Sequence, residues 1–257
     1  MSVADLFSVS GKVALVTGGS RGIGLMIASG VVEAGAKVYV ASRKQQDCDR
    51  AAAELSRVGT CFALPGDLAS HAGTRALADA FAAREPALHV LVNNAGANWG
   101  APLADYPEAG WDKVMALNVK AVFDLTRMLL PQLEAASKPG DPARVINVGS
   151  IDGLSVPLLD TYAYSASKAA VHHLTRVLAR KLAPQITVNA IAPGPFESKM
   201  MAETLKNFGD AIKKSCPMGR IGEASDMAGI AIYLASKAGA YVTGAVIPVD
   251  GGISTTK

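Results

Sequence analysis

Short apolar runs alternate with stretches of helical spacing along the whole chain, and this alternation restricts the possible fold more than any other feature. The runs are rich in Val, Ile and Leu, and glycines cluster where they end. They lie at 13–16, 38–41, 62–64, 90–92, 145–148, 186–191 and 245–249. Each run is apolar throughout instead of alternating, so both faces of each strand are expected to be buried. The pattern predicts a parallel sheet with helices on both faces.

The length fits one such domain. The chain has 257 residues, and the only Pro and Gly cluster that resembles a linker, at 138–142, leads directly into an expected strand. We therefore predict a single α/β domain over 1–257, doubly wound, with a mostly parallel seven-stranded sheet.

Composition and charge exclude several classes of protein. Half of the residues are hydrophobic and 18% are charged, which argues against disorder. No apolar run approaches the roughly 18 residues that a membrane helix needs. The net charge of +3 is scattered instead of concentrated in blocks, so neither a membrane nor nucleic acid is expected as a partner. Residues 1–10 lack the features of a signal peptide, and we expect a cytoplasmic protein.

The cysteines and histidines give no sign of a metal site. Cys48, Cys61 and Cys216 are widely separated and form no CxxC pair, so they are interpreted as reduced thiols. His172 and His173 are adjacent on an expected helix and point in different directions, so they cannot share a ligand. No metal is predicted.

The first chemical signal is a glycine-rich segment at 17–24, with the sequence TGGSRGIG. It follows the first strand and opens a helix to about Ala34, which Gly35 ends before the strand at 37–41. Glycines here let the backbone approach a phosphate, and the start of the helix offers unpaired N–H groups. The βαβ context favours a Rossmann dinucleotide site over a simple tight turn. The expected contacts are Gly18, Ser20, Arg21, Gly22, Ile23 and Gly24.

The end of the second strand indicates the form of the cofactor. NAD-selective sites place an acidic residue there, whereas this chain has Ser42 and Arg43. A guanidinium can bind a 2′-phosphate, and Arg21 adds a second positive charge, so NADP(H) is predicted. The alternative is that Arg43 is a solvated loop residue. Asp67, followed by Leu68, is expected to accept from the adenine amino group, or else to cap the next helix.

The second chemical signal is a tyrosine and a lysine four residues apart. Tyr164 and Lys168 lie near the start of a helix expected to reach about Leu182, and this spacing places them on one face. A neighbouring ammonium favours the ionised form of a phenol, so Lys168 is expected to lower the pKa of Tyr164. Ser150, at the end of the strand at 145–148, is expected to hold a substrate oxygen beside the phenol.

These motifs agree in order and spacing with one family. The sequence resembles the short-chain dehydrogenases/reductases over nearly its whole length, on the glycine loop, Asn93-Asn94-Ala95-Gly96, Asn118, Ser150, the Tyr164–Lys168 pair, Pro193-Gly194 and Val249-Asp250-Gly251-Gly252. The resemblance implies that Tyr164 is the general acid, that Ser150 orients the carbonyl, that Lys168 also holds the nicotinamide ribose, and that Asn118 maintains a water relay. It further implies cofactor contacts from Asn94, Ala95, Gly96, Tyr164, Lys168, Pro193, Gly194, Phe196 and Ser198.

Local features narrow the resemblance to a branch. The chain is similar to NADPH-dependent 3-oxoacyl reductases associated with rhamnolipid synthesis, in Trp99-Gly100, 217–220 and 241–244. The interval from Ser150 to Tyr164 is one residue longer than the commonest family spacing, which indicates an altered substrate loop at 151–161. Tyr162 has no lysine four residues on, so it is interpreted as a packing or substrate residue.

Substrate selection is expected to come from the loop at 151–161 and from a lid at about 195–218. The lid is rich in methionine and other apolar residues, which either cover a fatty or bulky substrate or only bury short helices. The predicted function is NADPH-dependent reduction of a ketone, such as a 3-oxoacyl thioester on an acyl carrier protein or on CoA. One alternative is an alcohol dehydrogenase or carbonyl reductase for cyclic or aromatic ketones. The other is a non-catalytic NADP(H) sensor. The resemblance also implies a homotetramer, and a dimer is the alternative that the sequence leaves open.

Overall fold

The computed structural model describes residues 2–157, 159–198 and 201–256. Within these ranges the strands form one parallel sheet in the order β3-β2-β1-β4-β5-β6-β7. The strands are β1 (Val13–Thr17), β2 (Lys37–Ala41), β3 (Thr60–Ala63), β4 (Val90–Asn93), β5 (Ala143–Val148), β6 (Ile186–Pro193) and β7 (Val246–Val249). This seven-stranded sheet is parallel throughout, whereas the sequence predicted a mostly parallel one.

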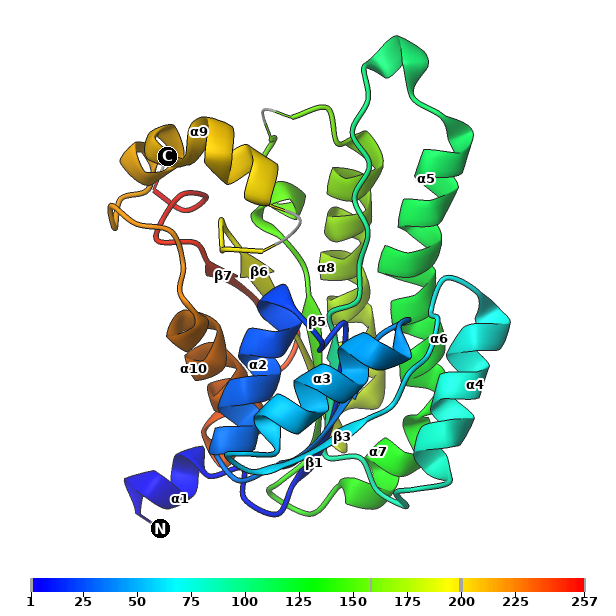
Figure 1. Cartoon of the computed structure of the whole chain (residues 1–257). Coiled ribbons are helices and arrows are strands. Elements are labelled where there is room, and N and C mark those ends of the chain that lie inside the picture. Colours follow the sequence, from blue (N-terminus) through cyan, green and yellow to red (C-terminus); the bar gives the residue numbers. More distant parts are fainter. Residues whose placement is uncertain (1, 158, 199–200, 257) are drawn as a thin grey trace.

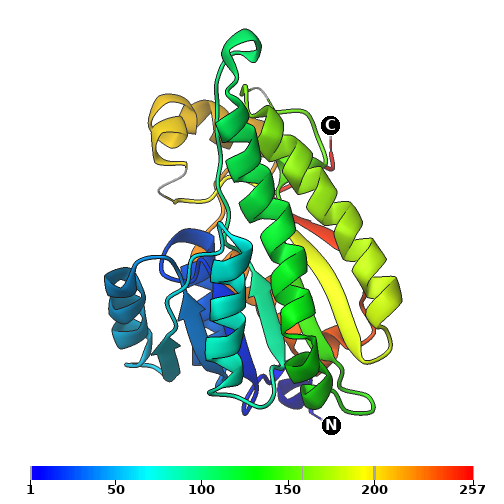
Figure 2. The ribbon, with the colours of Figure 1, turned by 90° about the vertical axis from the view of Figure 1, so that its right-hand side faces the viewer.

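Helices cover both faces of the sheet (Figures 1 and 2). One face carries α2 (Gly22–Glu33), α3 (Gln45–Leu55) and α10 (Ala224–Ala235). The other face carries α4 (His71–Ala82), α6 (Ala121–Met128), α7 (Leu130–Ala136) and α8 (Tyr162–Leu182). The remaining helical elements are α1 (Val3–Phe7), η1 (Leu103–Asp105), α5 (Glu108–Met115), η2 (Ala116–Lys120), η3 (Ile151–Gly153), α9 (Ala202–Ser215) and η4 (Lys237–Gly239).

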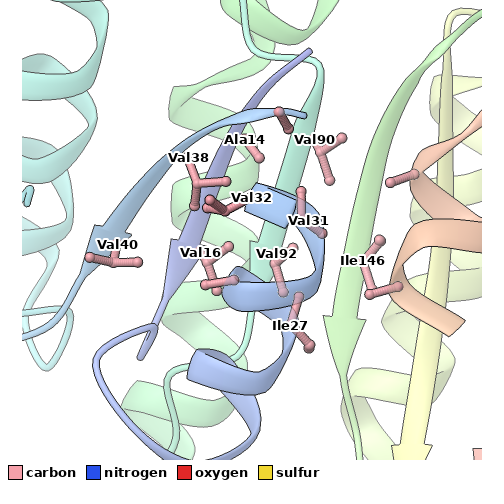
Figure 3. Close-up of a cluster of buried hydrophobic side chains, with 14 of the residues drawn as sticks. Ala14, Val16, Ile27, Val31, Val32, Val38, Val40, Val90, Val92 and Ile146 are labelled. Carbon is pink, nitrogen blue, oxygen red and sulfur yellow. The ribbon is translucent and has the colours of Figure 1, made fainter. Parts of the chain in front are cut away.

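The core has two layers because successive strand residues point to opposite faces. In β1, Ala14 and Val16 belong to the cluster under α2, α3 and α10, whereas Val13 and Leu15 belong to the cluster under α4, α6 and α8. Figure 3 shows the first cluster, in which Ile27 of α2 packs near Val92 of β4. Every residue of β1, β4, β5 and β6 is buried. The prediction that continuous apolar runs mark doubly covered strands is confirmed for these elements.

Boundaries agree closely with the sequence pattern where a strand is central. β2 has the predicted bounds, and α2 ends one residue before the predicted Ala34, with Gly35 at φ +93°. β3 begins two residues earlier than the run at 62–64. It is an edge strand in which Thr60 and Phe62 are exposed, so the apolar run in the sequence does not show where the strand begins.

The topology gathers the carboxyl ends of the strands at one edge of the sheet. The chain order reverses between β1 and β4, which is where doubly wound sheets bind ligands. The segment with η1 projects beyond α5 and α8 on one side of this edge, and α9 lies across it on the other (Figure 1). Among the described residues, none of the helices combines the length and the apolar character that a membrane crossing requires.

Candidate active site

The glycine-rich loop turns sharply from β1 into α2. Gly18 and Gly22 have φ of +64° and +53°, a conformation that glycine adopts without the usual steric cost. A Cβ on Gly18 would lie 2.6 Å from Nδ2 of Asn94, and a Cβ on Gly24 would overlap the Gly18 carbonyl. These glycines are therefore required by the path of the backbone itself.

The start of α2 suits a pyrophosphate. Arg21 occupies the N-cap position with extended backbone, and its side chain makes no capping hydrogen bond. The backbone N–H groups of the first turn and the positive end of the helix dipole are thus available to an anion. Ser20 is buried in the loop, Ile23 packs against the core, and Arg21 is exposed at the rim. The residues present fit the diphosphate of a dinucleotide.

The ends of β2 and β3 lie next to the glycine-rich loop, on the side where the sequence predicts the adenosine. Gly19 N donates to the Ala41 carbonyl at 3.3 Å, and Gly66 N donates to the Ser42 carbonyl at 3.0 Å. These bonds bring the loops after β1, β2 and β3 together. Arg43 is exposed directly after Ser42, where a 2′-phosphate would meet it.

Asp67 and Leu68 end this side of the site. The Asp67 Oδ1 accepts from Ala69 N at 3.0 Å, while Ser70 is the N-cap of α4 and accepts from Gly73 N at 3.1 Å. The alternative that Asp67 caps the helix is therefore wrong. Leu68 is buried in the core beneath Asp67, which leaves the exposed carboxylate available to an adenine.

Thr17 holds the loops after β1 and β4 together, and sequence reasoning missed it. Its hydroxyl donates to the Val92 carbonyl at 3.1 Å and accepts from the N–H groups of Asn94 and Ala95 at 2.9 and 3.0 Å. Asn94 Nδ2 in turn donates to the Thr17 carbonyl at 2.8 Å. A threonine at the end of a buried strand is the only signal that the sequence offers for this role.

Asn118 is buried within a π-helical turn between α5 and α6. Its Oδ1 accepts from Ala97 N at 2.8 Å, and its Nδ2 donates to the Ala97 carbonyl and to Ser167 Oγ, each at 2.9 Å. Gly96 passes close to the same side chain, because a Cβ there would lie 3.2 Å from Asn118 Oδ1. The π turn is a device often found at functional sites. Here Asn118 ties the loop after β4 to α8, the helix that carries Tyr164.

Ser150 follows β5 and begins the short helix η3. Its extended backbone makes it the N-cap, and its Oγ accepts from Asp152 N at 3.1 Å. With this donor in place, the hydroxyl hydrogen is free to donate to another oxygen. Ser150 is buried at the carboxyl edge of the sheet, as the sequence predicted for a substrate-orienting residue.

Tyr164 and Lys168 lie one turn apart on α8. The ammonium of Lys168 is 5.4 Å from the centre of the Tyr164 ring and donates to the Val148 carbonyl at 2.8 Å. Burial raises the pKa of Tyr164 to about 12, opposed by a hydrogen bond with Ser150. Burial also lowers the pKa of Lys168 to about 8.

This arrangement corrects one detail of the sequence prediction. Lys168 was expected to lower the pKa of Tyr164, but the phenol has a raised pKa because desolvation outweighs the other influences on it. The Lys168 ammonium is turned to the Val148 carbonyl at the end of β5. Tyr164 is accordingly a protonated phenol at neutral pH, which suits a proton donor.

The end of β6 contributes a segment that folds back over the glycine loop. Gly194 N donates to the Val249 carbonyl at 3.0 Å, and a Cβ on Gly194 would lie 2.6 Å from the Cβ of Asp250. Pro193 closes β6, and Ser198 lies near Gly22, where a Cβ would be 3.3 Å from the Cβ of the serine. The chain after β6 thus comes within contact distance of the start of α2.

Phe196 departs from its predicted role. Its ring is 1% exposed and packs directly on Gly222, within the cluster that includes Met227 of α10. It was expected to line the nicotinamide, but the side chain is part of the core. An aromatic residue near a cofactor motif does not reveal in sequence which way its ring turns.

Other residues of the expected substrate region pack against each other. Tyr162 donates from its hydroxyl to Asp160 Oδ1 at 2.8 Å, and its ring meets Tyr106 edge-on at 5.6 Å. Trp99 packs on Gly110 of α5, with the Lys113 ammonium 5.3 Å from its ring centre. Tyr162 therefore packs on its neighbours in this structure, and of the two tyrosines only Tyr164 is paired with a lysine.

A buried polar chain beneath the site was also missed. Asn93 Nδ2 donates to Asn147 Oδ1 at 2.9 Å and to Thr126 Oγ1 at 3.1 Å, and Asn147 Nδ2 donates to Thr175 Oγ1 at 2.9 Å. The chain joins α6, β4, β5 and α8. Buried amides must be satisfied, so these hydrogen bonds fix the register of α6, which follows the π turn of Asn118, and of α8, which carries Tyr164.

A doubly wound sheet with a phosphate-binding glycine loop and a serine, tyrosine and lysine at its carboxyl edge defines a nucleotide-dependent oxidoreductase of the Rossmann type. The model of the short chain dehydrogenase family matches residues 12–208. The chain therefore belongs to the short-chain dehydrogenases.

Individual relatives agree over nearly the full length. The rhamnolipids biosynthesis 3-oxoacyl-[acyl-carrier-protein] reductase of Pseudomonas aeruginosa is 51% identical over 250 residues, covering 96% of this chain and 97% of that protein. The solved Pseudomonas aeruginosa RhlG/NADP active-site complex superposes with a TM-score of 0.94 at 50% identity, covering 97% of this chain and 99% of that one. A gluconate 5-dehydrogenase from Burkholderia cenocepacia in complex with NADP and tartrate has a TM-score of 0.91 at 33% identity, with 99% of each chain covered.

Proposed function

We propose that this protein is an NADPH-dependent ketone reductase acting on 3-oxoacyl thioesters or on related bulky, hydrophobic ketones. The observation that carries the proposal is the presence of Ser150, Tyr164 and Lys168 at the same sheet edge as a glycine loop fit for a dinucleotide. The relative that acts on a 3-oxoacyl carrier-protein thioester supports the substrate class. The exposed Arg21 and Arg43 support the phosphorylated form of the cofactor.

Each residue of the proposed site has a separate role in the reaction. Ser150 donates its hydroxyl hydrogen to the substrate carbonyl oxygen, since a backbone N–H already occupies one of its lone pairs. Tyr164, protonated because its pKa is about 12, gives its proton to that oxygen as negative charge develops. The hydride is supplied by the nicotinamide of the bound cofactor. Lys168 holds the nicotinamide ribose, and Asn118 maintains the water relay that reprotonates Tyr164.

The remaining cofactor contacts follow the path of the dinucleotide over the sheet edge. Gly18, Ser20, Arg21, Gly22, Ile23 and Gly24 hold the diphosphate. Ser42, Arg43, Asp67 and Leu68 hold the adenosine. Asn94, Ala95, Gly96, Pro193, Gly194 and Ser198 lie along the nicotinamide side, together with the backbone of Phe196.

We propose that a lid at about 195–218 and the loop at 151–161 cover the substrate. Helix α9 has no buried residue along its whole length, although Leu205, Phe208 and Ile212 give it an apolar stripe. Apolar side chains are also exposed in the two loops beside Ser150: Trp99, Leu103, Leu154, Val156 and Leu159. Acyl chains would bury this surface. Leu158 and Met200, which belong to these segments, lie outside the described residues.

We further propose a cytoplasmic homotetramer assembled through the long helices. Figure 2 shows α5 and α6 in line with each other and α8 alongside them, over one face of the sheet. Trp111, Phe123 and Val177 are exposed on these helices at 41%, 42% and 44%. The three buried free cysteines support a reducing compartment. Light scattering on the purified chain is expected to give the mass of four copies, and a monomer would contradict the assembly.

The substrate class is tested with a panel of ketones and the loss of NADPH absorbance. 3-Oxoacyl thioesters on acyl carrier protein and on CoA are expected to give the highest kcat/KM, and NADH is expected to be a poorer donor. Turnover of cyclic or aromatic ketones alone would favour the carbonyl reductase alternative. Tight NADPH binding with no turnover of any ketone would contradict the proposed activity and favour a sensor.

A further inference from the structure

The turn that carries Ser150 is pressed against α8. A Cβ on Gly153 would lie 2.7 Å from the carbonyl carbon of Lys168 and 2.7 Å from Ala169 N, so only glycine allows η3 to approach so closely. Gly149, on the other side of Ser150, packs on the ring of His172. Two glycines thus seat the turn at 149–153 directly on the helix that bears Tyr164 and Lys168.

This contact seats Asp152 beside Ser150 and against the helix of Tyr164 and Lys168. Asp152 is the central residue of η3, half-buried, and its backbone N–H donates to Ser150 Oγ at 3.1 Å. Its carboxylate acts through space on both Lys168 and Tyr164. Burial raises the pKa of Asp152, and the Lys168 ammonium opposes that rise.

The charged groups around this cluster are few. Helix α8 contributes Tyr164, Lys168 and His172, and Arg176 lies one turn beyond His172. His172 is buried and has its pKa lowered to about 4, so it is neutral above that pH. Strand β6, which also packs on η3, has no ionisable side chain between Ile186 and Pro193. Among the described residues, Asp152 is thus the negative charge that acts on the Lys168 ammonium, and it opposes the effect of burial on the pKa of that group.

We propose that Asp152 is a positioning residue of the active site: its carboxylate keeps Lys168 charged and Tyr164 protonated, and so sets the alkaline limit of activity. This inference rests on the proposed reductase function. The sign follows from electrostatics, because a nearby anion raises the pKa of an ammonium and also that of a phenol. Loss of the carboxylate lets both groups lose their protons at lower pH.

The test compares wild type, Asp152→Asn and Asp152→Glu across about pH 6 to 10. The alkaline limb of kcat for ketone reduction is expected to move to lower pH by about half to one unit in the Asn variant and to stay in place in the Glu variant. The control is Asp160→Asn, an exposed carboxylate that binds Tyr162 in the same loop. Its alkaline limb is expected to match wild type. If the Asn variant does not fold, Asp152→Ser also removes the negative charge and is compared with wild type in the same way.

A second readout does not depend on turnover. NADPH affinity, followed by fluorescence, is expected to weaken as Lys168 loses its proton near pH 8, and this midpoint is expected to fall in Asp152→Asn. In Lys168→Met the transition is expected to vanish with or without the Asp152 change. If wild type reduces ketones, but Asp152→Asn shifts neither the alkaline limb of kcat nor the pH midpoint of NADPH affinity, the role of Asp152 is refuted. The proposed reductase function is then unaffected. If the pH midpoint of NADPH affinity shifts in Asp152→Asn but no ketone is turned over, the role of Asp152 is supported and the reductase function is refuted.

Discussion

At the scale of single residues, the proposed cofactor preference depends on which positions carry a charge and which do not. Arg43 stands at the end of β2, where an acidic residue would repel a 2′-phosphate. Ser42, beside it, has its hydroxyl 3.1 Å from the Cys48 thiol, at the first turn of α3. The proposed preference for NADPH over NADH therefore rests on the exposed arginines Arg21 and Arg43.

Replacing Arg43 tests this preference. Arg43→Ala is expected to raise the KM for NADPH about tenfold or more while leaving the KM for NADH nearly unchanged, because only the phosphorylated cofactor loses a charge-assisted contact. Initial rates with each cofactor measure the difference. Arg57→Ala, which removes an exposed arginine after α3, serves as the control. Equal increases in both KM values would show that Arg43 does not recognise the phosphate.

Sequence motifs predicted the residues that we propose for the site, but not the contacts around them. The glycine loop, Ser150 and the Tyr164–Lys168 pair follow from type and spacing, because local geometry decides them. The ring direction of Phe196, the hydrogen bonds of Thr17 and the charge of Asp152 beside Lys168 depend on contacts between segments far apart in the chain. The raised pKa of Tyr164 belongs to the same group, since burial is a property of the whole fold.

At the scale of elements, glycines decide how closely helices approach strands. Gly24 lies in the first turn of α2, where a Cβ would overlap the Gly18 carbonyl and the Asn94 amide. Gly209 lies in α9, where a Cβ would meet nothing within 4 Å. Gly24 is required for close packing, whereas Gly209 is not. Composition alone does not distinguish the two glycines.

A pair of substitutions separates the two roles. Gly24→Ala is expected to weaken NADPH binding at least tenfold and to lower the melting temperature, because the loop must move to admit the methyl group. Gly209→Ala is expected to leave NADPH affinity unchanged and to stabilise α9 by up to about 1 kcal/mol. Fluorescence titration and thermal unfolding measure both effects. Unchanged NADPH affinity in Gly24→Ala would contradict the assigned loop geometry.

The order of elements was predictable because each central strand is buried on both faces and each is followed by a helical pattern. The first residues of the edge strand β3 and the π turn at Ala116–Lys120 were not. An edge strand has polar, exposed positions. The π turn holds Asn118 in its hydrogen bonds with the backbone of Ala97, which is distant in sequence. Neither cause leaves a periodic trace in the sequence.

At the scale of the whole molecule, buried ionisable groups link stability to pH. His172 is 2% exposed, and burial lowers its pKa from 6.5 to about 4. In the unfolded chain this histidine binds a proton below about pH 6.5, whereas the folded protein holds it neutral until about pH 4. Its contribution to stability is therefore complete above pH 6.5 and is lost as the pH falls to 4.

Acid unfolding checks this linkage. The free energy of unfolding of wild type is expected to fall between about pH 6.5 and 4, with His172 responsible for up to about 3 kcal/mol. His172→Gln is expected to flatten this part of the curve, whatever its effect at pH 7. His173→Gln, at the exposed neighbouring position, is expected to retain the wild-type slope. Urea denaturation at each pH gives the values, and identical slopes in all three proteins would refute the role of His172.

The proposed reaction depends on Tyr164 as the proton donor beside a bound dinucleotide. The most direct measurement is the single-turnover rate of ketone reduction by Tyr164→Phe, with NADPH affinity measured on the same sample. The rate is expected to fall by at least about a thousandfold, while the dissociation constant for NADPH changes by less than about threefold, because the phenol hydroxyl is lost and the glycine loop is untouched. A rate within tenfold of wild type would show that Tyr164 is not the proton donor.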